Sequence, residues 1–380
     1  MFDQLIMDRV VATNNRAMKE FSAGKHLAAA NSFQKAYSLM SYDDPATRAQ
    51  LAFNVASTLM ELNEYTAALK WCDISLSHKH DDGVAYSKCL CNMHLGRFEA
   101  GLQDYKYRYL KDAADAVRFP KLPIPFVDDE IDGEGEIFRG KRVLVLNEQG
   151  FGDEILFLRA MDNLSKQCAA AKVQVYPELL RLVRSTIADR YTNITFFAER
   201  SLSVEDVKTF DLYTATGSLW AAFQRFETLP PINFGRAKVV RQSDKVSIGF
   251  ITSPNKASKN AQSRAVAEKV FKRLGNENRQ LYNLQYRTNF AWADNTLSHE
   301  IDDFYDLYEA MSAMDVVVTC DTGAAHLAHS MDIPAILVYT NYLDWRWEYR
   351  TFYPNAKIIQ ARCVDKLSAA IDEYVSGVGK

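Results

Sequence analysis

The chain changes its hydrophobic period about a third of the way along. Up to about residue 115, apolar side chains recur at the three- and four-residue spacing of amphipathic helices. From Lys141 onward, short β-branched runs alternate with helical stretches. Alternating strands and helices predict a parallel sheet covered by helices. We therefore expect an α plus α/β protein with a helical N-terminal part.

The helical part repeats itself. Gly24, Asn63 and Gly96 each close a predicted helix and lie 39 and 33 residues apart. Five residues after each comes a small residue, and nine residues after it a larger one: Ala29 and Phe33, Ala68 and Cys72, Gly101 and Tyr105. The spacing brackets the repeat of about 34 residues that is typical of tetratricopeptide proteins. Over roughly 100 residues the segment resembles that family, which implies about three repeats and a concave surface for a protein partner. A plain helical bundle is the alternative.

A proline-rich stretch separates this part from the rest. Residues 118–126 contain three prolines, which exclude a helix, and residues 128–136 contain six acidic side chains. We expect a helical domain over residues 1–117 and a linker over residues 118–139.

Two α/β units follow, over residues 140–236 and 237–380. In the first, the predicted strands are 142–147, 172–176, 194–197 and 210–213, and the predicted helices are 154–164 and 177–189. In the second, the predicted strands are 245–251, 280–285, 316–318, 334–339 and 357–360, and the predicted helices are 265–274, 304–314 and 366–375. We expect two Rossmann-like domains in tandem.

Each unit has a loop with candidate chemistry after a strand. Gln149, Gly150, Gly152 and Asp153 form a glycine-bearing loop after the first strand. In the second unit, Asp321 to His326 form a turn into a helix, whose amide groups can bind an anion. We interpret this turn as the cradle of the diphosphate of a nucleotide-linked substrate. An ordinary strand-to-helix turn is the alternative.

Three motifs in order carry a further resemblance: Gly150-Phe151-Gly152-Asp153, Asp321-Thr322-Gly323-Ala324-Ala325-His326, and Asp344-Trp345-Arg346-Trp347. Over about residues 140 to 362 the chain resembles the heptosyltransferase-like glycosyltransferases of family 9, in particular those fused to tetratricopeptide repeats. The resemblance implies a GT-B fold, with an acceptor domain at 140–236, a nucleotide-sugar donor domain at 237–380, and no required metal or other cofactor. One loop departs from the family, because Ser253-Pro254-Asn255 replaces its usual Trp-x-Gly-Asn-Pro.

Glycosyl transfer needs a base for the acceptor hydroxyl. Asp153 is our first candidate, since the resemblance implies an aspartate there, and Glu148 is the second. Gln149, Gly150 and Gly152 would form the acceptor loop around them. Asp153 can instead serve as a helix cap, so that alternative stays open.

The leaving diphosphate needs positive charge or dipoles. Arg264 is the best candidate cation, followed by Lys256, with Lys259 nearby; a solvated basic loop is the alternative. The remaining donor-binding candidates are the residues of the turn: Asp321, Thr322, Gly323, Ala324 and His326. His326 can donate to a phosphate or sugar oxygen, or can be a buried structural histidine like His329.

Two less specific features follow in the second unit. Residues 339–353 hold seven aromatic side chains, which favour packing between the domains over stacking on a nucleobase, and Arg346 lies among them, where it can stack or form an ion pair. Gln285 ends a predicted strand and is a weaker candidate for reading a base edge.

The composition limits the kinds of binding partner that we expect. The net charge of −3 argues against a general polyanion binder, although residues 236–287 carry twelve basic and three acidic side chains. The six scattered cysteines show no zinc spacing, and no apolar run reaches the ~18 residues of a membrane helix, so we expect a cytoplasmic protein. We predict a metal-independent glycosyltransferase that transfers a sugar from a nucleotide-sugar donor with inversion, and the sequence does not identify the sugar. A protein or glycan acceptor is favoured over DNA or another nucleic acid, and a non-catalytic scaffold with a degenerate nucleotide site is the alternative.

Overall fold

The computed structural model describes residues 2–40, 44–109, 121–128, 135–199, 202–223, 229–239, 244–254, 261–349 and 352–377. It divides into two compact units, Met1–Pro120 and Lys121–Lys380, which are described separately. The candidate cations Lys256 and Lys259 lie outside the described residues.

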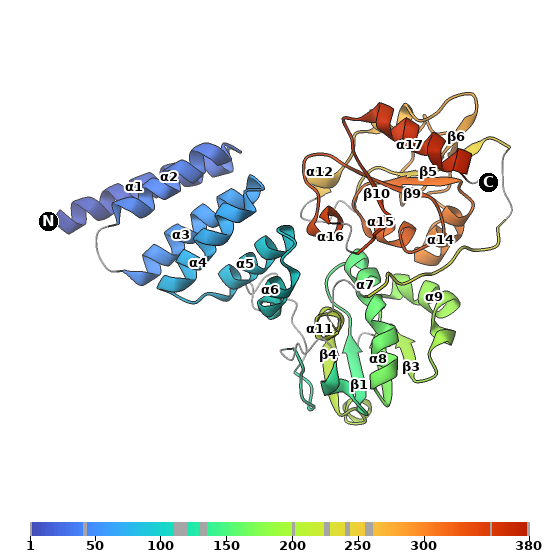
Figure 1. The fold of residues 1–380 in the computed structure, drawn as a ribbon, viewed down its shortest axis with the longest axis horizontal. Coiled ribbons are helices and arrows are strands. Elements are labelled where there is room, and N and C mark those ends of the chain that lie inside the picture. The colour runs from blue at the N-terminus through green and yellow to red at the C-terminus, as the bar shows by residue number, and fades with distance from the viewer. Residues whose placement is uncertain are drawn as a thin grey trace. The chain divides into compact units, whose positions relative to one another are not determined.

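The N-terminal unit consists of helical pairs (Figure 1). The pairs are α1 (Phe2–Ser22) with α2 (His26–Leu39), α3 (Pro45–Glu61) with α4 (Tyr65–His78), and α5 (Asp82–His94) with α6 (Phe98–Gln103), followed by the 3-10 turn η1 (Tyr105–Tyr109). Each pair also contacts the next, so the helices stack as tetratricopeptide repeats do. The predicted helical repeat architecture is confirmed.

The three turn residues have the same backbone conformation. Gly24, Asn63 and Gly96 have φ values of 72°, 59° and 68°, the left-handed region that ends helices. In each turn the next amide reaches back five residues, as from Glu64 N to the Leu59 carbonyl at 2.9 Å. Ala29 and Ala68 are fully buried, and a methyl group on Gly101 would lie 3.0 Å from the Met93 sulfur. Small residues therefore let the paired helices touch.

The C-terminal unit begins with a parallel sheet of strand order β3-β2-β1-β4 in the residues described. Its strands are β1 (Arg142–Leu146), β2 (Ala170–Gln174), β3 (Ile194–Phe197) and β4 (Leu212–Ala215). Its helices are α7 (Phe151–Phe157), α8 (Met161–Gln167), α9 (Pro177–Thr186), α10 (Val204–Val207) and α11 (Thr216–Ala222), with 3-10 turns η2 (Glu136–Phe138), η3 (Leu158–Ala160) and η4 (Ala188–Arg190). We call this the first α/β domain.

The second α/β domain is built on a parallel sheet with order β10-β9-β8-β5-β6-β7 among the described residues. Its strands are β5 (Val246–Ile251), β6 (Arg279–Asn283), β7 (Asn295–Thr296), β8 (Val316–Thr319), β9 (Ala335–Tyr339) and β10 (Lys357–Gln360). Its helices are α12 (Ala261–Arg264), α13 (Glu268–Lys272), α14 (Phe304–Ser312), α15 (Gly323–Ala328), α16 (Trp345–Glu348) and α17 (Val364–Gly377). Helix α17 covers one face of the sheet, and α14 and α15 lie on the other (Figure 1).

The burial pattern explains this layering. Alternate residues of the central strands, such as Ile248 and Phe250 in β5, join one apolar core with Phe271 of α13 and Ile371 of α17. Strand β8 is buried along its whole length. Residues buried on both faces form continuous apolar runs, which is why the run at Val316 to Val318 predicted a strand correctly.

The proline-rich segment is more than a linker. Tyr213 in β4 donates its amide to the Pro125 carbonyl at 2.9 Å and accepts from the Val127 amide at 2.9 Å, so this segment extends the edge of the first sheet. Phe138, also within the predicted linker, is fully buried. The prolines and the acidic run after them predicted a linker, but the edge of β4 provides hydrogen-bonding partners for an extended chain.

Candidate active site

Both predicted loops lie at the carboxyl ends of strands where the sheet order reverses. The first sheet reverses between β1 and β4, and the second between β5 and β8. Ligands of open parallel sheets bind at such points, because the loops of two neighbouring strands diverge there. The residues after β1 and after β8 are therefore the places to look for a site.

After β1, the chain turns sharply into α7. Gln149 has a φ of 61°, Gly150 is the N-cap residue, and Asp153 stands three residues later. The Asp153 carboxylate accepts from the Gly150 amide at 3.1 Å. The helix thus starts at Phe151, earlier than the predicted Glu154, and Asp153 has the capping role that was one of the two interpretations.

After β8, Thr322 is the N-cap of α15. Its hydroxyl accepts from the Ala325 amide at 3.3 Å and donates to the Cys320 carbonyl at 3.3 Å. Gly323 and Ala324 occupy the first turn, where helix geometry directs the amides away from the helix. Asp321 precedes the cap residue and is buried, with 7% of its surface exposed.

The two helix starts contact each other directly. A methyl group added to Gly152 would lie 2.5 Å from Cδ2 of His326 and 3.4 Å from the Gly323 Cα. One added to Gly323 would lie 3.1 Å from the Phe151 Cβ. Because neither glycine has a side chain, the two helices can approach each other this closely.

Beside this contact, an ion pair joins the two α/β domains. The Arg346 guanidinium donates to Asp153 Oδ1 through one nitrogen and to Asp344 Oδ1 at 2.8 Å through the other. It also lies over the Trp345 ring, 4.4 Å from the ring centroid. The Asp153 and Arg346 side chains are 21% and 15% exposed. Asp153 thus lies at the edge of the contact and stays partly exposed to solvent.

A second ion pair lies within the second α/β domain. Arg264 Nη1 is 3.8 Å from Asp321 Oδ2, and the Trp347 indole donates to Asp321 Oδ1 at 3.0 Å. Burial and the neighbouring Asp344 carboxylate raise the pKa of Asp321 to about 6, against the opposing effect of Arg264. The structure therefore brings the predicted residues Arg264, Asp321 and Asp153 together, and adds Arg346 and Asp344 to them.

The His326 side chain is buried and contacts other protein side chains. Its Nδ1 is 2.8 Å from the Tyr353 hydroxyl, its ring lies 4.7 Å from the Trp347 ring, and only 4% of it is exposed. Burial and the nearby Arg346 lower its pKa well below 6.5, so the ring is neutral at physiological pH. Of its two interpretations, the buried histidine held by a neighbour agrees with this geometry. His329 donates from its Nδ1 to the Ala325 carbonyl, 2.9 Å away.

Glu148 is buried rather than exposed to substrate. It is 2% exposed, and its Oε1 accepts from the Gly217 amide at 2.8 Å, at the start of α11. It therefore fills the crevice between β1 and β4 and joins the two strands' loops. Its neighbour Glu154 is fully buried and accepts from the Tyr176 amide at 3.1 Å. Burial raises the pKa of Glu154 to about 8.

Gln285 is also engaged within the protein. Its Oε1 accepts from the amides of Thr252 and Ser253 at 3.0 and 3.1 Å, and its Nε2 donates to the Ser253 carbonyl at 3.0 Å. These bonds hold the beginning of the loop after β5. The suggestion that Gln285 reads a base edge does not fit this arrangement, because its amide is used to shape the loop.

Aromatic side chains pack the two α/β domains together, as the sequence favoured. Trp220 of α11 lies 6.3 Å from Trp345 and 5.9 Å from Phe352, centroid to centroid. The buried Arg159 donates to the Phe352 carbonyl at 3.1 Å. What the sequence did not indicate was that Arg159 joins this packing, since an arginine inside a helical pattern usually marks an exposed face.

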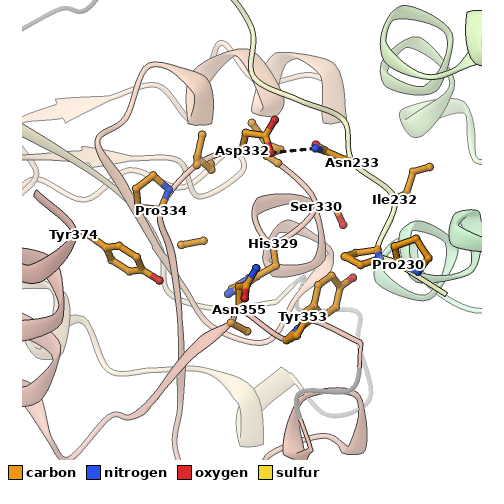
Figure 2. A pocket seen from close by; sticks show the side chains of 16 residues that line it. Pro230, Ile232, Asn233, His329, Ser330, Asp332, Pro334, Tyr353, Asn355 and Tyr374 are labelled. Carbon is orange, nitrogen blue, oxygen red and sulfur yellow. Dashed lines mark hydrogen bonds between the residues drawn. The ribbon is translucent and has the colours of Figure 1, made fainter. Parts of the chain in front are cut away.

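A separate cavity of about 680 Å³ lies at the other end of α15. His329, Tyr353 and Pro230 contribute to its wall, and Asn233 donates to Asp332 at 3.0 Å across its rim (Figure 2). It contains none of the predicted donor or acceptor residues. The described residues hold no group of three or more potential metal ligands, and none of their helices is both long and apolar enough to cross a bilayer.

Two parallel α/β domains, each directing a helix start at the other, are the architecture of GT-B glycosyltransferases. Residues 303–366 match the family model described as glycosyltransferase family 9 (heptosyltransferase). This range includes the Asp321–His326 turn and the Asp344–Trp347 stretch. The predicted family resemblance is thus confirmed over these residues, which form part of the second α/β domain.

Among curated proteins, protein FlbA of Caulobacter vibrioides is 30% identical over 115 residues, which is 29% of this chain and 18% of that protein. The match therefore spans less than a fifth of that relative's length.

Three solved structures are similar in part. Escherichia coli ADP-heptose lps heptosyltransferase II is 11% identical, with 63% of this chain and 100% of that chain covered and a TM-score of 0.44. The family 9 glycosyl transferase of Veillonella parvula is 11% identical, with 62% and 90% covered and a TM-score of 0.41. The tetratricopeptide domain of Arabidopsis FLU is 16% identical, with 27% and 93% covered and a TM-score of 0.26.

Proposed function

We propose that this protein is a glycosyltransferase that moves a sugar from a nucleotide-sugar donor to a hydroxyl acceptor. The observation that carries the proposal is the meeting of the Gly150–Asp153 loop, through Gly152, with the Asp321–His326 turn, which lies in the region matched by the family 9 model. Both groups lie at the reversal points of their sheets, where substrates of parallel α/β domains bind.

In the proposed reaction, an Asp153 oxygen takes the proton of the acceptor hydroxyl. The acceptor oxygen then forms a bond to the anomeric carbon from the side opposite the diphosphate. The bond between that carbon and the diphosphate oxygen breaks, and the electron pair leaves with the diphosphate. This displacement inverts the anomeric centre.

Arg264 would neutralise the leaving diphosphate, together with the amides at the start of α15. These cationic and dipolar groups allow a reaction without a metal. The tetratricopeptide repeats favour a protein acceptor, or a glycan carried on one, over nucleic acid, because stacked repeats offer a surface for peptides.

Asp153→Asn tests the base. The amide keeps the side chain's size and its ability to accept from the Gly150 amide, but it cannot take a proton. We expect turnover to fall at least about 1,000-fold while nucleotide binding is retained, within the range for loss of a general base. Full activity of this variant would remove Asp153 as the base.

A non-catalytic scaffold is the second candidate. It is favoured by the closeness of the two helix starts, which leaves Gly152 and Gly323 in contact with protein atoms. Thermal unfolding with UDP-, GDP- and ADP-sugars distinguishes the candidates. A donor at 100 times its Kd should stabilise the folded state by about 2.7 kcal/mol, whereas a degenerate site would give no shift.

A further inference from the structure

Asp153 is held from both sides of the contact between the α/β domains. Its Oδ2 accepts from the Gly150 amide of its own helix, and its Oδ1 accepts from Arg346 of the second domain. One bond to each oxygen fixes the rotation of the carboxylate plane. The remaining lone pairs of both oxygens then have defined directions.

Arg346 is itself firmly supported. Asp344 accepts from its other nitrogen at 2.8 Å, and the Trp345 ring lies beneath its guanidinium. The neighbouring Trp347 is fully buried and donates to Asp321. A planar guanidinium can hold two carboxylates at once in a set geometry, which a lysine cannot do. The short helix α16 therefore connects the donor turn to Asp153.

We propose that Arg346 is a positioning residue for the base: it orients the Asp153 carboxylate toward the acceptor hydroxyl. The inference rests on the proposed function. Because Arg346 and Asp153 belong to different α/β domains, the base is correctly oriented only while the two domains are in contact. The Asp-Trp-Arg-Trp stretch is then part of the active site and not only of the domain packing.

The chain provides a matched control. Arg181 of α9 also joins the two domains, through Asp303 at 3.3 Å and through Asp306 of α14. Its side chain is 49% exposed, and it contacts neither Asp153 nor the Asp321–His326 turn. Arg181→Ala therefore removes a cross-domain ion pair without altering the support of the base.

The experiment is a double-mutant cycle on the full chain. Sugar transfer and donor binding are measured for the wild type, R346A, R346K, D153N and D153N/R346A. R181A is the control. We expect R346A to lower kcat about 100-fold, the effect of a small misplacement of a reacting group, with the donor KM little changed. R346K should recover only part of the loss. In the D153N background, R346A should have almost no further effect, because its partner is already inactive.

Three results would overturn the inference. The first is an R346A effect on kcat as large in the D153N background as in the wild type. The second is a loss of donor affinity that matches the loss of activity, which would mean that Arg346 binds the diphosphate, and the third is an R346A enzyme as active as R181A. If R346A does not fold, the same comparison is made with R346K, which keeps the charge. A wild type that transfers no sugar from any donor would instead refute the proposed function itself.

Discussion

Gly150 and Gly152 lie on either side of Phe151 at the start of α7, but only Gly152 is sterically constrained. A methyl group on Gly152 would overlap the His326 ring at 2.5 Å, whereas one on Gly150 would meet only Asp153 Oδ2 at 3.4 Å. We expect Gly152→Ala to cost about 1–3 kcal/mol of stability, as overpacking does, and to reduce activity. Gly150→Ala, whose φ of −100° suits alanine, is the control. Urea unfolding measures the stability of the two variants, and kcat measures their activity. Equal stability and activity of Gly152→Ala and Gly150→Ala would contradict the contact between Gly152 and His326.

Glu154 makes stability depend on pH. Burial raises its pKa to about 8 from 4.5, so the folded state binds the proton more tightly than the unfolded state. Its contribution is therefore complete below pH 4.5 and is lost as the pH rises toward 8. The buried His326 and His329, whose pKa values are lowered, are neutral in the folded state. In the unfolded state they still release protons near pH 6.5, so they add an opposing slope that becomes small above about pH 7.

Between pH 7 and 8 we thus expect the free energy of unfolding to fall by up to about 1.4 kcal/mol per pH unit because of Glu154. Glu154→Gln should remove this slope, since its amide oxygen can still accept from Tyr176. Denaturant unfolding at the two pH values provides the measurement. A variant with the wild-type slope would show that another group is responsible.

At the scale of elements, the turns between repeat helices depend on backbone conformation. Gly24 has a φ of 72° and no atom within 4 Å of an added methyl group, so an alanine there would meet strain but no clash. We expect Gly24→Ala to cost about 1–2 kcal/mol in unfolding free energy. Gly24→Asn should cost less, because asparagine tolerates this conformation, as Asn63 does in the next turn. Equal stability of both variants and the wild type would argue against this account.

At the scale of the whole molecule, the proposed chemistry depends on arginines and helix amides. Removing divalent metals with a chelator should therefore leave sugar transfer within about twofold of the untreated rate, since the leaving diphosphate is already neutralised by fixed charges. The measurement is kcat before and after treatment, with each metal then added back. Loss of activity that one metal restores would refute a metal-independent reaction.

The sequence predicted the elements of this protein well because its local patterns are unambiguous. Buried parallel strands require continuous apolar runs, as at Val316 to Val318, and left-handed turn residues require glycine or asparagine, as at Gly24, Asn63 and Gly96. The sequence also indicated both loops of the candidate site, since each follows a strand at a recognisable helix start.

Only the tertiary structure decided how those loops are used. Asp153 meets Arg346, 193 positions later in the chain, and Glu148 turns inward to the Gly217 amide. Whether a carboxylate faces solvent, a helix start or an arginine depends on packing between distant segments, which no local pattern encodes. For the same reason the sequence did not show that Gly152 and Gly323 are the places where α7 and α15 touch.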